Sequence, residues 1–169
     1  MLSSGRFRQA CLNRQGFDHL AEPDKVRLDL PLRFTPALCL ALAAVGVVLR
    51  SPLLLGALAT GAVIAALDRA HPFDWLYNTA VQPLIGGPAL PPNPSPRRFA
   101  FVMAAPVLAG TTVAFALDAA VLGTVLGALQ LAGCATYVAT GWCPGSFAHE
   151  KLFGRRLPTA DVQLGADHG

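Results

Sequence analysis

Long apolar stretches separated by short polar ones dominate this chain. Four ranges carry no Asp, Glu, Lys or Arg: 34–49, 51–67, 99–117 and 119–149. A helix needs about 20 apolar residues, or about 17 at the least, to cross about 30 Å of hydrocarbon. The last two ranges exceed that length. The first two reach it only if flanking apolar residues and the extended side chains of Arg33 and Arg50 contribute.

The pattern predicts an all-α membrane protein with four transmembrane helices and a short interfacial helix. The expected spans are about 33–49, 52–67, 97–117 and 119–142. Ser51 and Ser95 are each followed by proline, a pair typical of helix starts, and Asp118 can cap the fourth span. The connections near Arg50 and Asp118 are short, which predicts two antiparallel hairpins. A re-entrant hairpin over residues 34–67 is the alternative for the first pair.

The range 71–98 differs from the apolar stretches around it. Its first half has apolar residues at the spacing of one helical face, which predicts a short amphipathic helix on the inner leaflet. Residues 86–96 contain five prolines and two glycines, a composition typical of a stiff, extended spacer. Arg97 and Arg98 follow the spacer, where we expect both guanidinium groups to reach lipid phosphates.

Composition agrees with this assignment, and the charges orient the chain. Hydrophobic residues make up 53% of the sequence, charged residues only 14%, and the mean hydropathy is +0.48. If residues 1–33, 68–98 and 150–169 share one side of the membrane, that side holds twelve of the thirteen Lys and Arg residues, and Arg50 lies opposite. Because positive charge accumulates on the cytoplasmic side, both termini are expected there.

The expected organisation is then a cytoplasmic N-terminal tail, a membrane domain and a cytoplasmic C-terminal tail. Their ranges are 1–29, 30–149 and 150–169, with a cytoplasmic loop at 68–96 inside the membrane domain. The net charge of +3 follows from this topology, and the sequence has no aromatic and basic pattern that predicts nucleic-acid binding.

The densest polar group is the candidate binding or interface loop. Its residues are His71, Phe73, Asp74, Trp75, Tyr77, Asn78, Asn93, Arg97 and Arg98. Helix capping and headgroup contacts explain such a group more simply than catalysis does. A metal or acid–base site would need partners from elsewhere, such as His149 or Glu150. We therefore predict no metal and no cofactor.

Among the four cysteines, Cys143 is the candidate reactive thiol. It lies in the sequence GWCPGS at the cytoplasmic end of the fourth span, whereas Cys39 and Cys134 lie in apolar ranges that favour inert packing. Cys134 and Cys143 are nine residues apart, so one continuous helix would turn them to opposite faces. The negative C-terminal end of a helix would also disfavour a thiolate at Cys143.

Other features inside the spans indicate packing and no ion pathway. Gly123 and Gly127 have the small-xxx-small spacing that lets helices approach closely, within this bundle or between copies. The polar residues of the spans are Thr and Gln, which do not ionise, and this argues against a proton-coupled pump.

Three runs resemble one family of uncharacterised bacterial membrane proteins, the domain of unknown function 4395. They are HPFDWLYN at 71–78, PPNPSPRRFAF at 91–101 and WCPGS at 142–146, and the resemblance covers about residues 25–156. LPLRFTP at 30–36 is similar to the family's approach to its first span, where the family has Asn in place of Thr35. The resemblance implies a bacterial inner-membrane protein. Some members are associated with thioredoxin-like or rhodanese-type modules, which implies a thiol or sulfur context.

Three functions are consistent with these features. The first is a non-enzymatic membrane component that docks a cytoplasmic partner, such as a thioredoxin-like or rhodanese-type protein, through the loop and tails. The second is a thiol redox or sulfur-trafficking protein that uses Cys143. The third is a small-molecule carrier built as a homo-oligomer in the lipid bilayer.

Overall fold

The computed structural model describes residues 2–154, and all regular elements in that part of the chain are helical. In chain order the α-helices are α1 (Leu2–Leu12), α2 (Glu22–Asp29), α3 (Phe34–Val48), α4 (Pro52–Leu67), α5 (Pro72–Leu76), α6 (Gln82–Ile85), α7 (Ser95–Ala116), α8 (Ala120–Thr140) and α9 (Pro144–Phe153). Wide π-type turns occur at Asn13–Phe17 and Tyr77–Val81, and a 3-10 turn at Pro31–Arg33 precedes α3. The all-α prediction is confirmed for these residues.

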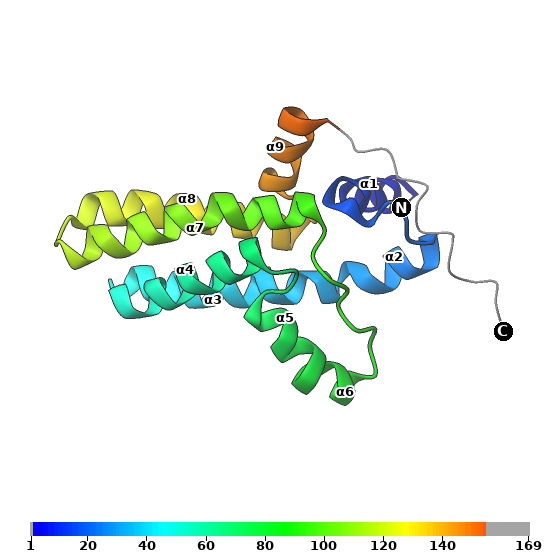
Figure 1. Ribbon diagram of the computed structural model, residues 1–169, viewed down its shortest axis with the longest axis horizontal. Coiled ribbons are helices and arrows are strands. Elements are labelled where there is room, and N and C mark those ends of the chain that lie inside the picture. The colour runs from blue at the N-terminus through cyan, green and yellow to red at the C-terminus, as the bar shows by residue number, and fades with distance from the viewer. Residues whose placement is uncertain (1, 155–169) are drawn as a thin grey trace.

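The four long helices α3, α4, α7 and α8 form one bundle (Figure 1). Around the bundle, α3 contacts α4 and α8, and α7 contacts the same two helices from the other side. In length and composition, three segments of the described chain can each cross a membrane: Pro31–Val48, Ser95–Ala116 and Ala120–Thr140. A fourth is the bent pair Pro52–Leu67 and Pro72–Ile85, whose axes differ by 87°. Residues 2–154 therefore contain three or four candidate membrane-spanning segments.

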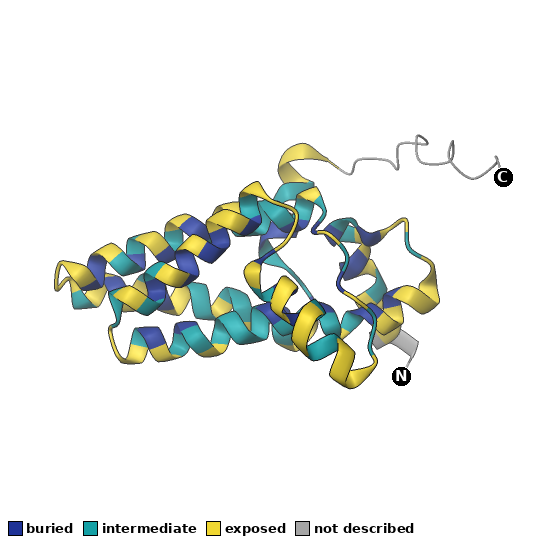
Figure 2. Cartoon of the chain, turned by 60° about the horizontal axis from the view of Figure 1, so that its bottom comes forward, coloured by how far each residue is buried: buried dark blue, intermediate teal, exposed yellow. Residues whose placement is uncertain are grey.

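Exposed positions run along the outside of the bundle (Figure 2), and many of them carry large apolar side chains, as expected for a surface that faces lipid. Among the most exposed are Val48, Leu53, Val121 and Val125. The interior of the bundle is apolar as well, with Leu55 and Leu58 in its core, and two threonines, Thr35 and Thr111, are fully buried there. Apolar residues both inside and outside the bundle fit a membrane protein.

Both tight turns of the bundle close in the same way. Ser51 N–H donates to the carbonyl of Gly46, and Ala119 N–H donates to the carbonyl of Ala114, each at 2.8 Å. These bonds are the 6→1 contacts of a helix end whose next residue is left-handed. That residue is Arg50 (φ 48°) in the first turn and Asp118 (φ 56°) in the second. Figure 1 shows both turns at one end of the bundle, away from the other helices.

The small-xxx-small pair of α8 packs within this chain. A Cβ atom at Gly123 would lie 2.6 Å from Phe115 Cε1 of α7, and a Cβ atom at Gly127 would lie 2.5 Å from Val47 Cγ2 of α3. Both glycines are therefore needed for α8 to approach its two neighbours.

At the other end of the bundle, the segment expected to be an N-terminal tail folds back as α1 and α2 (Figure 1). Its apolar side chains form a second core with residues of the α5 region and the proline spacer. The buried members of this core are Leu12, Phe17, Leu28, Leu32, Tyr77 and Leu90. The expected C-terminal tail begins inside α9, which packs against α7, and residues 155–169 lie outside the described part.

Candidate functional site

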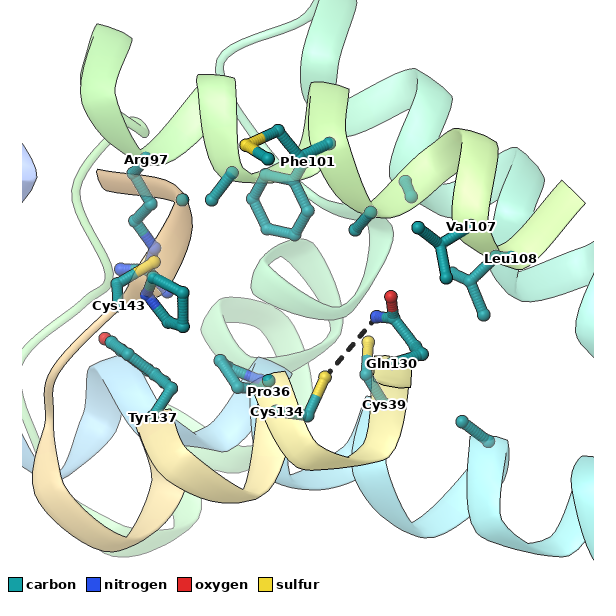
Figure 3. A pocket seen from close by; sticks show the side chains of 18 of the residues that line it. Pro36, Cys39, Arg97, Phe101, Val107, Leu108, Gln130, Cys134, Tyr137 and Cys143 are labelled. Atoms are coloured by element: carbon teal, nitrogen blue, oxygen red, sulfur yellow. Dashed lines mark hydrogen bonds between the residues drawn. The ribbon is translucent and has the colours of Figure 1, made fainter. Parts of the chain in front are cut away.

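A cavity of about 310 Å³ lies inside the bundle near the end where α9 packs (Figure 3). Helices α3, α4, α7 and α8 supply its walls, and the link between α8 and α9 closes one end. Most of its surface is apolar. Its polar lining residues are Gln15, Cys39, His71, Arg97, Gln130, Cys134, Tyr137 and Cys143. A concave apolar site with a few converging polar groups is the usual form of a small-molecule site.

Three of the four cysteines line this cavity, and they come from separate elements: Cys39 from α3, Cys134 from α8 and Cys143 from the link to α9. The expectation of opposite faces for Cys134 and Cys143 is wrong, because α8 ends at Thr140. Gly141 adopts φ 76° and its N–H donates to the carbonyl of Tyr137, so the chain turns and Cys143 comes back to the cavity.

Cys143 also has a different local setting from the one expected. It is the N-cap residue of α9, whose first turn contains Pro144. The N-terminal end of a helix carries a positive partial charge, the opposite of the C-terminal setting predicted from a continuous fourth helix. α9 is held in place by Ser146 Oγ, which donates to the carbonyl of Pro96 at 3.1 Å. It also packs closely on α7 at Gly145, where a Cβ atom would lie 2.5 Å from Ala100 Cα.

Asp74 is the centre of a buried polar cluster beside the cavity. Its Oδ1 accepts a hydrogen bond from Thr35 Oγ1 at 2.6 Å. Its Oδ2 accepts two more, from the backbone N–H of His71 at 2.9 Å and from Asn93 Nδ2 at 2.7 Å. All four residues are at most 4% exposed. The carboxylate therefore joins α3, the start of α5 and the proline spacer.

His71 connects this cluster to the cavity. Its Nδ1 accepts the N–H of Phe73 at 3.1 Å, so in the neutral ring the proton lies on Nε2, which is 4.0 Å from Cys39 Sγ. Burial lowers the pKa of His71 to about 4; the charge of Asp74 opposes this change and that of Arg97 adds to it. The ring is therefore neutral at pH 7, and its N–H points toward a thiol of the cavity wall.

The two adjacent arginines, for which the sequence predicts contacts with lipid phosphates, both donate to carbonyls of the protein. Arg98 donates to the carbonyls of Ala66 and Leu67 at the C-terminal end of α4. Arg97 is 4% exposed and donates through Nη2 to the carbonyl of Leu32 at 3.0 Å. Its Nη1 is buried with no hydrogen-bond partner. Figure 3 shows Arg97 and Cys143 at the same end of the cavity.

Of the other side chains of the predicted interface loop, some are buried in the protein and some are exposed. Tyr77 is 2% exposed and packs against Phe34. Asn78 exchanges two hydrogen bonds with the backbone of Leu90 and so fixes the spacer. Phe73 is half-buried, and Trp75 is 67% exposed. Most of the loop's polar groups are thus bonded within the chain.

Sequence reasoning missed three residues of the site. Gln15 donates to the carbonyl of Gly141 and accepts from the hydroxyl of Tyr137 at 2.9 Å, which ties the N-terminal segment to the end of α8. Thr35 holds Asp74. These contacts join positions 39 to 126 residues apart, and no local pattern marks them. In the described residues no group of three or more His, Cys, Asp or Glu side chains is placed to hold a metal ion.

The sequence model of one protein family, described as a domain of unknown function (DUF4395), matches residues 30–153. The chain belongs to this family. The match includes all four bundle helices, α9 and every lining residue of the cavity except Gln15. No curated protein and no solved structure matches the chain. The family description names no activity, so the residues of the cavity are the basis for proposing one.

Proposed function

We propose that this DUF4395 protein is a small membrane protein whose Cys143 thiol takes part in sulfur transfer. The observation that carries the proposal is the convergence of Cys39, Cys134 and Cys143, from three separate elements, on one cavity. In a mainly apolar cavity a single thiol is ordinary packing. Three thiols beside a guanidinium group and an imidazole form a set suited to sulfur chemistry.

The step proposed at Cys143 needs no external oxidant. A donor persulfide, R–S–SH, is attacked at its outer sulfur by the thiolate of Cys143; the bond between the donor's two sulfurs breaks, and a new S–S bond forms at Cys143 Sγ. The donor leaves as R–S⁻ and takes up the proton that Cys143 gave up on ionising, so R–SH is released and Cys143–S–SH remains. Sulfur atoms and electrons balance. Cys134 and Cys39 are second thiols on the same cavity to which the outer sulfur can pass.

The expected donor is a cytoplasmic rhodanese-type or thioredoxin-like protein, a partner that the family resemblance suggests. The location proposed is the bacterial inner membrane, with the α9 end of the bundle in the cytoplasm. The charge distribution supports this orientation, because twelve of the thirteen Lys and Arg residues fall in segments assigned to that side.

The test is transfer of one sulfur atom in vitro. Purified protein in lipid nanodiscs is mixed with glutathione persulfide, and peptides are analysed by mass spectrometry after alkylation. We expect a sulfur gain at Cys143 in the native chain and in Cys11→Ser, and none at that position in Cys143→Ser. Sulfur found equally on Cys11, which is buried in α1, would show unspecific reaction and sink the proposal.

A docking role is the second candidate, supported by one exposed surface. Trp75, Leu84 and Ile85 of the α5–α6 region are 67%, 86% and 62% exposed. These side chains suit a lipid interface or a partner protein equally. Capture of a rhodanese-type protein by the native chain, and its loss in Leu84→Ser with Trp75→Ala, would favour docking.

A further inference from the structure

The cavity contains a buried guanidinium group, that of Arg97, which forms no ion pair within the described part of the chain. Arg97 is 4% exposed, and its guanidinium group makes one hydrogen bond, to the carbonyl of Leu32. Its Nη1 has no partner and is shielded from solvent. Burying a charged group without a counter-charge costs several kcal/mol. A group retained at such a cost commonly serves a ligand.

The surroundings of Arg97 are suited to a negative charge. No Asp or Glu is among the described residues that line the cavity. Cys143 and Gly145, at the N-terminus of the ten-residue helix α9, line the same end. The first N–H groups of a helix lack intrahelical partners and bind anions. The guanidinium of Arg97 and the start of α9 are therefore two independent features at the same end of one cavity (Figure 3).

The remainder of the cavity is apolar. Ala43 and Leu58 of the first helix pair face Val107, Leu108 and Leu129 of the second, and Figure 3 shows Val107 and Leu108 at the end away from Arg97. A volume of about 310 Å³ is at the lower end of the range for small-molecule sites. The site thus has a charged end and a hydrocarbon end.

We propose that this cavity binds an organic monoanion with an apolar body, such as a medium-chain carboxylate. The carboxylate would lie against the guanidinium group of Arg97 and the first free N–H groups of α9, which begin at Gly145, and the hydrocarbon would fill the space between α3, α4, α7 and α8. One guanidinium group matches one negative charge, which favours a carboxylate over a dianionic phosphate. The proposal shares the cavity with the proposed sulfur transfer, but binding does not depend on the thiol chemistry.

The first experiment measures saturable binding of radiolabelled decanoate to the native chain in lipid nanodiscs, with empty nanodiscs as background. Unlabelled decanoate should displace the label. 1-Decanol has the same apolar body without the charge, and it should compete at least tenfold less well; inorganic sulfate should not compete. Equal competition by decanol would show that the carboxylate does not contribute to binding. Equal competition by sulfate would mean that a free inorganic anion is the ligand. Either result overturns the proposal, as does the absence of saturable binding.

The second experiment compares substitutions of Arg97 with a substitution of the adjacent Arg98. Arg97→Gln retains a donor for the carbonyl of Leu32 but removes the charge, and should weaken decanoate binding by at least tenfold, as expected for the loss of a charge-assisted hydrogen bond of about 1.5–3 kcal/mol. Arg97→Lys keeps the positive charge, and its affinity for decanoate should lie between those of the native chain and Arg97→Gln. Arg98→Gln is the matched control, because Arg98 bonds to the end of α4 and does not line the cavity. Its binding should equal that of the native chain.

The apolar end is tested without touching Arg97. Gly133 lines the cavity, and a Cβ atom there would have no neighbour within 4 Å, so the side chain of Gly133→Phe starts in open space and is used to occupy the cavity. It should abolish decanoate binding while the protein still elutes as a single species; unchanged binding would overturn the proposal. On the native chain, saturable decanoate binding without a sulfur gain at Cys143 would leave this proposal standing and overturn the sulfur transfer, and a sulfur gain without saturable binding would do the reverse. The two proposals therefore fail independently.

Discussion

The hydroxyl of Thr35 donates to Asp74 Oδ1 at 2.6 Å, and this contact joins the first turn of α3 to the first turn of α5. The same carboxylate is in a capping box with His71 and also holds Asn93. Three donors therefore converge on one buried acceptor group. Because each donor belongs to a different segment, Asp74 determines how the 71–98 region rests on the bundle.

Two substitutions of Asp74 should differ in stability, because they leave different numbers of buried hydrogen-bond donors without an acceptor. Asp74→Leu leaves three buried donors without an acceptor and should lower the free energy of unfolding by about 3–5 kcal/mol. In Asp74→Asn the amide oxygen can replace Oδ2 and the amide nitrogen can donate to Thr35, so the loss should be about 1–2 kcal/mol. Thermal unfolding in detergent measures both. Equal stability of the two variants would contradict the role of Asp74 as a shared acceptor.

The lowered pKa of the buried imidazole of His71 predicts that the fold becomes less stable in acid. The pKa of His71 is about 4 in the folded chain, whereas an unfolded histidine has a pKa of about 6.5. Between these values the unfolded state binds more protons, so the stabilisation present above pH 6.5 is lost as pH falls toward 4. The loss amounts to about 3 kcal/mol.

The measurement is the unfolding midpoint of the native chain and of His71→Gln between pH 7.5 and pH 4.5. We expect the difference between the two proteins to shrink steadily as the pH falls, because the variant has no imidazole to protonate. Curves that stay parallel over this range would show that His71 does not titrate with unfolding. His19, which is exposed, provides a control substitution with no expected effect.

The close packing of α8 predicts opposite results for two glycines of the same helix. Gly127→Ala places a methyl group 2.5 Å from Val47 Cγ2, so α3 and α8 must separate, at a cost of about 1–3 kcal/mol. Gly133→Ala meets no atom within 4 Å and removes a flexible residue from a helix, so it should be neutral or stabilising by up to about 1 kcal/mol. If both variants unfold at the same temperature, α8 does not pack as described.

The sequence predicted the helices of the bundle because charge-free runs and helix-start residues are local signals. Ser51 is the N-cap of α4, and its Oγ accepts from the N–H of Leu54. The break between α8 and α9 also had a local signal, Gly141 followed by Pro144, but the absence of charge through residue 149 hid it. The family was predicted correctly from its motifs.

The cavity itself had no such signal. The three thiols are brought together by the turn at Gly141 and by the packing of α3 on α8, which are tertiary events. Arg97 looked like a residue at the membrane surface because an arginine next to a hydrophobic run usually lies there. In the folded chain its guanidinium group donates to the carbonyl of Leu32, a residue of the second core with Tyr77 and Leu90, and this contact forms only once the chain is folded.

The orientation proposed for the bundle predicts which turns are accessible from outside intact cells. A membrane-impermeant maleimide should label Ala119→Cys at the turn between α7 and α8, and Ser51→Cys at the turn between α3 and α4, because both turns lie at the end with only Arg50 for positive charge. It should not label Asp68→Cys at the opposite end until the cells are lysed. External labelling of Asp68→Cys would reverse the orientation. Labelling of Ala119→Cys without Ser51→Cys would mean that α3 and α4 enter and leave the membrane on one side.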